Sequence, residues 1–110
     1  KTIMAHCVWP PLKEIDRMAE KGVYIAHCPQ SNTNLSSGIA PVRTFLDRGM
    51  NVGLGSDVAG GAGESIFRAM ADAVQVSKLR WRLVDDGLKP LTIDEAFYLG
   101  TMVRGYCSIE

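Results

Sequence analysis

The chain has 110 residues, of which 46% are hydrophobic and 22% are charged, and twelve Lys and Arg residues balance twelve Asp and Glu residues. This composition is typical of a folded globular domain and argues against a disordered, collagen-like or coiled-coil chain. The balanced charge disfavours nucleic-acid and anionic-membrane partners, and no apolar run approaches the roughly 18 residues of a membrane span.

The cysteines and the first residues of the chain bear on its setting. Three cysteines stand at positions 7, 28 and 107. An odd number at irregular spacing argues against a disulfide framework and indicates a reducing compartment, so we interpret all three as small core or loop residues. The chain lacks an initiator Met and enters an apolar strand within one residue. We therefore expect it to be a piece of a longer protein.

The first half of the chain alternates between predicted strands and predicted helices. Short apolar runs predict strands at 2–5, 23–26 and 51–55, each buried on both faces. The first helix has Pro11 in its first turn and ends at Gly22, and the second runs over 40–48 and is closed by Gly49. Leu12, Ile15, Met18 and Ala19 mark the buried face of the first helix, and Val42, Phe45 and Leu46 that of the second.

The second half of the chain is predicted to be helical after a glycine-rich loop at 57–63. A long helix is expected over 64–83. Thr92 and Glu95 have the spacing of a capping box, which predicts a helix from there to about residue 103.

The element order predicts an α/β fold with a parallel sheet. Three parallel strands cannot close a barrel, and a (β/α)8 barrel needs about 250 residues. Two architectures therefore remain open, which are a small doubly wound domain and the last part of a barrel.

Three titratable residues follow the three predicted strands. His6 and His27 come directly after the first two strands, and Asp57 follows the third. Because ligands bind at the carboxyl ends of parallel strands, we expect these side chains to converge on one site. Imidazole and carboxylate suit zinc or another divalent metal. The spacing alone leaves both a metal site and a polar pocket without metal open.

Four segments contain or follow the predicted strands: Thr2-Ile-Met-Ala-His6-Cys, Ile25-Ala-His27-Cys-Pro-Gln-Ser-Asn32, Leu35-Ser-Ser-Gly38 and Asn51-Val-Gly-Leu-Gly-Ser-Asp57-Val-Ala-Gly-Gly61. Together these segments resemble the amidohydrolase superfamily, and within it the guanine deaminases. The resemblance implies that residues 1–110 are the carboxy-terminal fragment of a TIM-barrel domain, with strands six to eight and their helices. The reaction it implies is hydrolysis of guanine to xanthine and ammonia.

The resemblance also implies a role for individual residues. Asp57 corresponds to the catalytic aspartate that binds zinc and takes a proton from the attacking water. His6 corresponds to the catalytic histidine that lies beside the metal and polarises the water or the tetrahedral intermediate. His27, Asn32 and Ser37 would bind or shape the substrate pocket, with His27 as pocket wall and loop anchor.

The chain departs from the family pattern in its ligand set. The family needs a His-x-His pair after strand one, and a histidine and a glutamate after strand five, whereas this chain has two histidines, neither of them in such a pair. Asp57 would then be the one ligand present for Zn2+, or alternatively Fe2+. We expect the isolated chain to be inactive.

Two other functions remain open. One is another amidohydrolase, such as an S-adenosylhomocysteine deaminase or a chlorohydrolase-like enzyme, and the other is a non-catalytic α/β fragment that folds by association. The resemblance implies a small-molecule purine substrate, the remainder of the barrel as partner, a homodimer in the parent protein and a cytoplasmic location.

Overall fold

The computed structural model describes the backbone of residues 2–109 and the side chains of residues 2–102. Its centre is a parallel sheet of three strands in the order β1-β2-β3. The strands are β1 (Ile3–Ala5), β2 (Tyr24–His27) and β3 (Val52–Leu54). All three predicted strands and the parallel α/β architecture are thereby confirmed.

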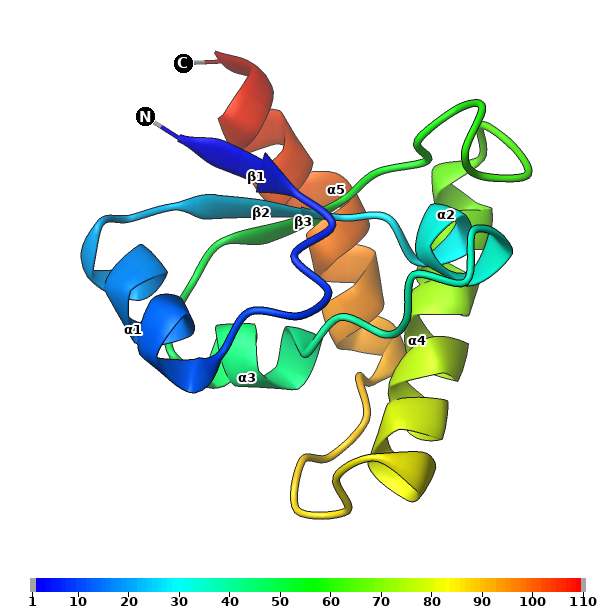
Figure 1. Ribbon diagram of the computed structural model, residues 1–110. Coiled ribbons are helices and arrows are strands. Elements are labelled where there is room, and N and C mark those ends of the chain that lie inside the picture. The colour runs from blue at the N-terminus through cyan, green and yellow to red at the C-terminus, as the bar shows by residue number, and fades with distance from the viewer. Residues whose placement is uncertain (1, 110) are drawn as a thin grey trace.

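Residues 2–109 also form five helices, which pack below, behind and beside the sheet (Figure 1). They are α1 (Leu12–Glu20), α2 (Pro29–Asn34), α3 (Val42–Asp47), α4 (Ile66–Leu83) and α5 (Ile93–Ile109). Four of them lie where the sequence predicts helices, although α5 extends six residues beyond the predicted end. The short helix α2 was not predicted. None of the described helices is long and apolar enough to cross a membrane.

The helix ends follow the local sequence signals. The capping box before α5 is confirmed, because the Thr92 backbone N–H donates to Glu95 Oε1 at 3.0 Å and the Glu95 N–H donates to Thr92 Oγ1 at 3.1 Å. Gly22 and Gly49 follow α1 and α3 with φ of 64° and 71°. This left-handed conformation is accessible to glycine without a steric penalty and ends both helices.

The hydrophobic core lies between the sheet and its helices. Ile15 of α1, Phe45 of α3 and Leu99 of α5 are each at most 2% exposed, and Val52 of β3 is completely buried. Leu12 departs from the predicted buried face of α1, because it lies in the first turn and is 60% exposed. Helices α1 and α3 lie on one side of the sheet, and α5 runs beside β3 (Figure 1).

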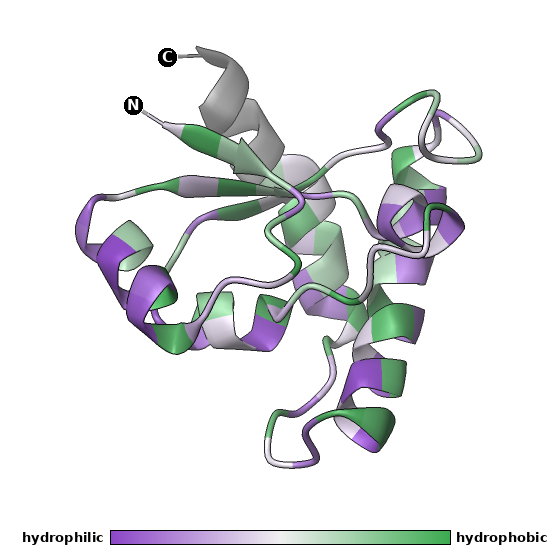
Figure 2. Ribbon diagram, in the orientation of Figure 1, coloured by the Kyte–Doolittle hydropathy of each residue, from purple (hydrophilic) through white to green (hydrophobic). Residues whose placement is uncertain are grey.

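Strand β1 departs from the prediction that every strand is buried on both faces. Ile3 and Met4 are 52% and 42% exposed, whereas every residue of β3 is buried. Both strands are edges of the sheet and pair with β2 alone among the described residues, but α3, α4 and α5 pack against β3, whereas β1 packs mainly against β2. Figure 2 shows hydrophobic residues along this edge as well as along the central strand. The apolar sequence of β1 is typical of a strand covered on both faces, but in this structure β1 is an exposed edge.

Candidate functional site

The carboxyl ends of the three strands point the same way, towards α2 and the loop that joins β3 to α4 (Figure 1). His6 directly follows β1, His27 is the last residue of β2, and Asp57 stands three residues after β3. The backbone ladder continues into this region, because the His6 N–H donates to Ala26 O and the Gly55 N–H donates to His27 O, both at 2.9 Å. The parallel register therefore places all three residues at one edge of the sheet.

The backbone turns sharply at two of these residues. His6 and Asp57 have φ of 67° and 48°, in the left-handed region that few residues other than glycine adopt. Such conformations persist where the surrounding structure enforces them, and they are concentrated at functional sites. The loop after Asp57 is tied back to α2, because Asn34 Nδ2 donates to Gly60 O at 2.9 Å. The turns thus direct both side chains out of the sheet.

The side chains of His6 and Asp57 face one another across an open surface. His6 Nε2 lies 3.9 Å from Asp57 Oδ2, and the two side chains are 41% and 37% exposed. The other ring nitrogen, His6 Nδ1, lies 3.0 Å from Asn32 Oδ1. The structure thus brings together His6, Asp57 and Asn32, three of the residues that the sequence analysis named.

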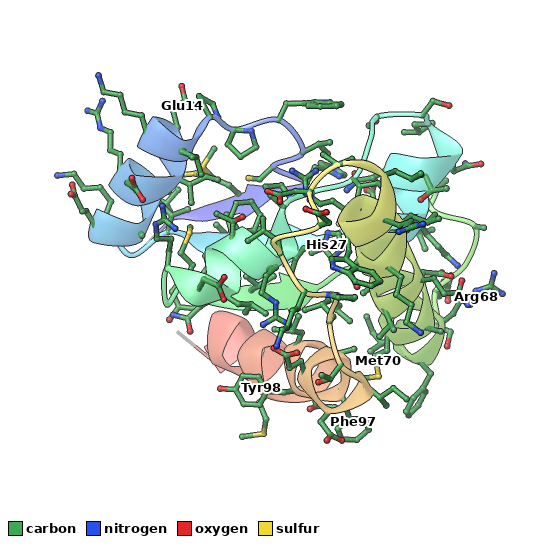
Figure 3. The ribbon with its side chains drawn as sticks, turned by 90° about the horizontal axis from the view of Figure 1, so that it is seen from below. Glu14, His27, Arg68, Met70, Phe97 and Tyr98 are labelled. Carbon is green, nitrogen blue, oxygen red and sulfur yellow. The ribbon has the colours of Figure 1, made fainter. Side chains whose placement is uncertain are left out.

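His27 lies beneath this surface rather than on it. It is 1% exposed, and Figure 3 shows it in the interior of the molecule. Burial lowers the pKa of its imidazole from 6.5 to about 4, and the electrostatic influence of His6 acts in the same direction. At neutral pH the ring is therefore uncharged. Neither of its nitrogens has a hydrogen-bond partner among the described residues.

Helix α2 supplies two buried polar side chains to the site, Ser31 and Asn32, which are 1% and 2% exposed. The sequence analysis did not select Ser31. A Cβ added at Gly60 would lie 2.7 Å from Ser31 Oγ and 2.8 Å from Asp57 Oδ2, so the hydroxyl and the carboxylate approach the same point. The signal that could have identified α2 is Pro29, which occupies the first helical turn.

Ser37 occupies a different position from the other predicted substrate-binding residues. It is exposed in the loop after α2, where its backbone N–H donates to Asn32 O at 2.8 Å and its carbonyl accepts from Trp9 Nε1 at 2.7 Å. Among the described residues no hydrogen bond joins its hydroxyl to His6 or Asp57. Ser37 thus contributes to the shape of the loop through its backbone.

Cys28 packs under the site as a buried thiol. It is 5% exposed, and its Sγ lies 3.0 Å from the position that a Cβ on Gly55 would take. Burial raises the pKa of the thiol, and the negative charge of Asp57 raises it further, whereas a hydrogen bond from the His6 backbone opposes both. Cys28 therefore stays protonated, which agrees with its interpretation as a core residue. Cys7 is half-buried, and the side chain of Cys107 lies outside the described residues.

The side chains at this edge do not by themselves form a metal centre. A catalytic zinc site uses three protein ligands and a water. No group of three or more His, Cys, Asp and Glu side chains within the described part of the chain could hold a metal ion. Asp57 and His6 offer two donors on one side of an open surface. A metal bound here would need further ligands from beyond these residues.

Comparison with known sequences places residues 1–103 in the amidohydrolase family. Over 102 residues the chain is 41% identical to the guanine deaminase of Dictyostelium discoideum. This match covers 93% of the chain and 22% of that protein. Over 89 residues it is 45% identical to the 5-methylthioadenosine/S-adenosylhomocysteine deaminase 2 of Archaeoglobus fulgidus. This second match covers 81% of the chain and 21% of that protein. The chain thus spans about a fifth of the length of these relatives.

Solved structures give the same result. The guanine deaminase of C. acetobutylicum, with guanine bound in its active site, is 43% identical and superposes with a TM-score of 0.91 over 96% of this chain and 25% of that one. The atrazine chlorohydrolase TrzN of Arthrobacter aurescens TC1, complexed with zinc, is 30% identical with a TM-score of 0.78 over 96% of this chain and 23% of that one. A metal cofactor thus occurs among the neighbours of this fold.

Proposed function

We propose that this chain, which belongs to the amidohydrolase family, is the carboxy-terminal part of the barrel of an enzyme that hydrolyses guanine to xanthine and ammonia. The observation that carries the proposal is the similarity to a guanine deaminase with bound guanine, at 43% identity and a TM-score of 0.91 over 96% of the chain. In this assignment β1, β2 and β3 are strands six, seven and eight of the barrel. His6, His27 and Asp57, at the carboxyl ends of these strands, would then line the guanine site.

Asp57 is the proposed proton acceptor and donor. Its carboxylate is accessible at the strand ends and lies beside the imidazole of His6. It would accept a proton from the attacking water as the water oxygen bonds to the ring carbon that bears the exocyclic amine. It would return the proton to that amine, which leaves as ammonia. A positioned carboxylate of this kind contributes about 10²- to 10⁴-fold to the rate of such a reaction.

The other site residues would surround the reacting atoms. His6 would hold the water or the oxygen of the tetrahedral intermediate opposite Asp57, and Asn32 and Ser37 would border the substrate. His27, buried and uncharged, would support the floor of the site. Asp57 would also be a ligand of the implied Zn2+ or Fe2+, but the described residues do not complete that site. The cytoplasmic location, the homodimer and the inactivity of the isolated chain remain predictions.

A chimeric enzyme tests the proposal. These residues would replace the matching quarter of the C. acetobutylicum guanine deaminase, and xanthine and ammonia formation from guanine would be measured. We expect the chimera to deaminate guanine and D57N to lower kcat by at least about a hundredfold. The matched control is D94N, which removes an equal charge from an exposed position in the first turn of α5. Equal kcat values for D57N and the unmodified chimera would refute the role of Asp57.

A second candidate is deamination of S-adenosylhomocysteine or 5-methylthioadenosine, favoured by the 45% identity to the A. fulgidus enzyme. The same chimera, assayed on these two substrates, does not separate the candidates by itself because most of its pocket comes from the guanine deaminase. The longer polypeptide that carries these residues should therefore be assayed in parallel on guanine and S-adenosylhomocysteine. Turnover of the second alone would replace the guanine assignment.

A further inference from the structure

Asn32 is held in a single position by the backbone on both sides of it. Its N–H donates to Cys28 O at 3.0 Å within α2, and its carbonyl accepts from the Ser37 N–H at 2.8 Å. The residue is 2% exposed. Its side chain therefore has little freedom to turn away from His6, whose Nδ1 lies 3.0 Å from Asn32 Oδ1.

This contact bears on which ring nitrogen of His6 carries the proton. A neutral imidazole has one N–H and one lone pair, and an amide oxygen can only accept a hydrogen bond. With Asn32 Oδ1 facing Nδ1, an N–H on Nδ1 can donate to the amide oxygen, and this tautomer leaves the lone pair on Nε2. We propose that Asn32 is a positioning residue that keeps the His6 proton on Nδ1, so that the Nε2 lone pair faces Asp57 Oδ2 across 3.9 Å.

The consequence for catalysis rests on the proposed function. A water oxygen about 2.8 Å from each of two acceptors fits at the apex of a triangle whose base is the 3.9 Å separation of Nε2 and Oδ2. Such a water donates one hydrogen to Nε2 and the other to the carboxylate. Both of its lone pairs then stay free, and one of them can form the new bond to the ring carbon while its proton passes to Asp57. The opposite tautomer would direct an N–H at this water and occupy a lone pair.

Nuclear magnetic resonance of the 110-residue chain tests the proposal without substrate. Long-range ¹H–¹⁵N spectra, recorded well above the ordinary imidazole pKa of about 6.5, report which ring nitrogen is protonated. The chain has two histidines, so H6Q assigns the signals by removing one set. We expect His6 to be protonated on Nδ1 in the unmodified chain. A protonated Nε2, or a mixture of the two tautomers, would overturn the proposal.

Variants at position 32 separate positioning from mere packing. N32L removes the acceptor and should abolish the single tautomer, whereas N32D restores an acceptor oxygen and should keep the proton on Nδ1. The control N51L alters an exposed asparagine at the opposite end of β3 and should leave the tautomer unchanged. If N32L does not fold, N32D decides, because loss of the Nδ1 proton in that variant contradicts the proposal. These spectra measure no turnover, so a result against the Nδ1 tautomer does not contradict guanine deamination. Equally, a chimera that does not deaminate guanine does not contradict the Nδ1 tautomer.

Discussion

Replacing Glu95 with Gln should destabilise the chain, because this one carboxylate joins three segments. Arg43 of α3 donates to it through Nη1 at 2.8 Å and Nη2 at 2.7 Å. The same guanidinium donates to the carbonyls of Lys89 and Pro90, each at 3.0 Å. The carboxylate also accepts the Thr92 N–H at the start of α5. The pair thus fastens α3 to the loop before α5 and to the first turn of that helix.

The pKa of Glu95 sets the magnitude of the effect. The hydrogen bonds from Arg43 are the main cause that lowers this pKa from 4.5 to about 2. At about 1.4 kcal/mol for each tenfold change in the ionisation constant, this corresponds to an upper limit of roughly 3 kcal/mol. The two side chains are 20% and 32% exposed, so solvent screening reduces the expected loss to about 1–2 kcal/mol. Gln can still accept the Thr92 N–H, so the cap is retained in E95Q.

The sign of the pH dependence follows from the lowered pKa. The unfolded chain binds a proton at Glu95 more readily than the folded chain does. The contribution of the pair is therefore fully present above pH 4.5 and is lost as the pH falls towards 2. Stability differences between the unmodified chain and E95Q should shrink over this interval.

Thermal and urea unfolding at neutral pH and near pH 2 would measure the effect. We expect Tm to fall by roughly 4–16 °C in E95Q at neutral pH. D94N is the matched control, because it removes a neighbouring charge in the same helical turn without contacting Arg43. The reasoning would be refuted by equal stability of E95Q and D94N at neutral pH, or by a difference that persists unchanged near pH 2.

Two further predictions concern the site. Burial lowers the pKa of His27 to about 4, so its contribution to stability is fully present above pH 6.5 and is lost as the pH falls towards 4. Urea unfolding should therefore show that the free energy of unfolding falls by roughly 2 kcal/mol between pH 7 and pH 5. The variant H27Q should lack this loss. G60A would bring a methyl group within 2.8 Å of Asp57 Oδ2, whereas G63A meets nothing within 4 Å. Guanine turnover in the chimera should therefore fall in G60A and persist in G63A, and equal values would contradict the geometry of the loop.

Local signals in the sequence were sufficient for most of the secondary structure. Thr92 and Glu95 lie three residues apart, so their capping box depends only on the turn that contains them. Helix α2 was missed because its polar sequence has no amphipathic periodicity, and its buried face is formed by packing against α4. The exposure of β1 was also mispredicted, because an apolar run does not reveal whether other elements pack against it.

The sequence by itself determined that His6, His27 and Asp57 lie at one edge, because the carboxyl ends of parallel strands share an edge whatever the helices do. Only the tertiary structure decided how these side chains are used. It buried His27, left Asp57 accessible and placed Asn32, 26 residues along the chain, against His6. It also paired Arg43 with Glu95 across 52 residues. Such contacts depend on the packing of whole elements, which side-chain spacing along the chain does not encode.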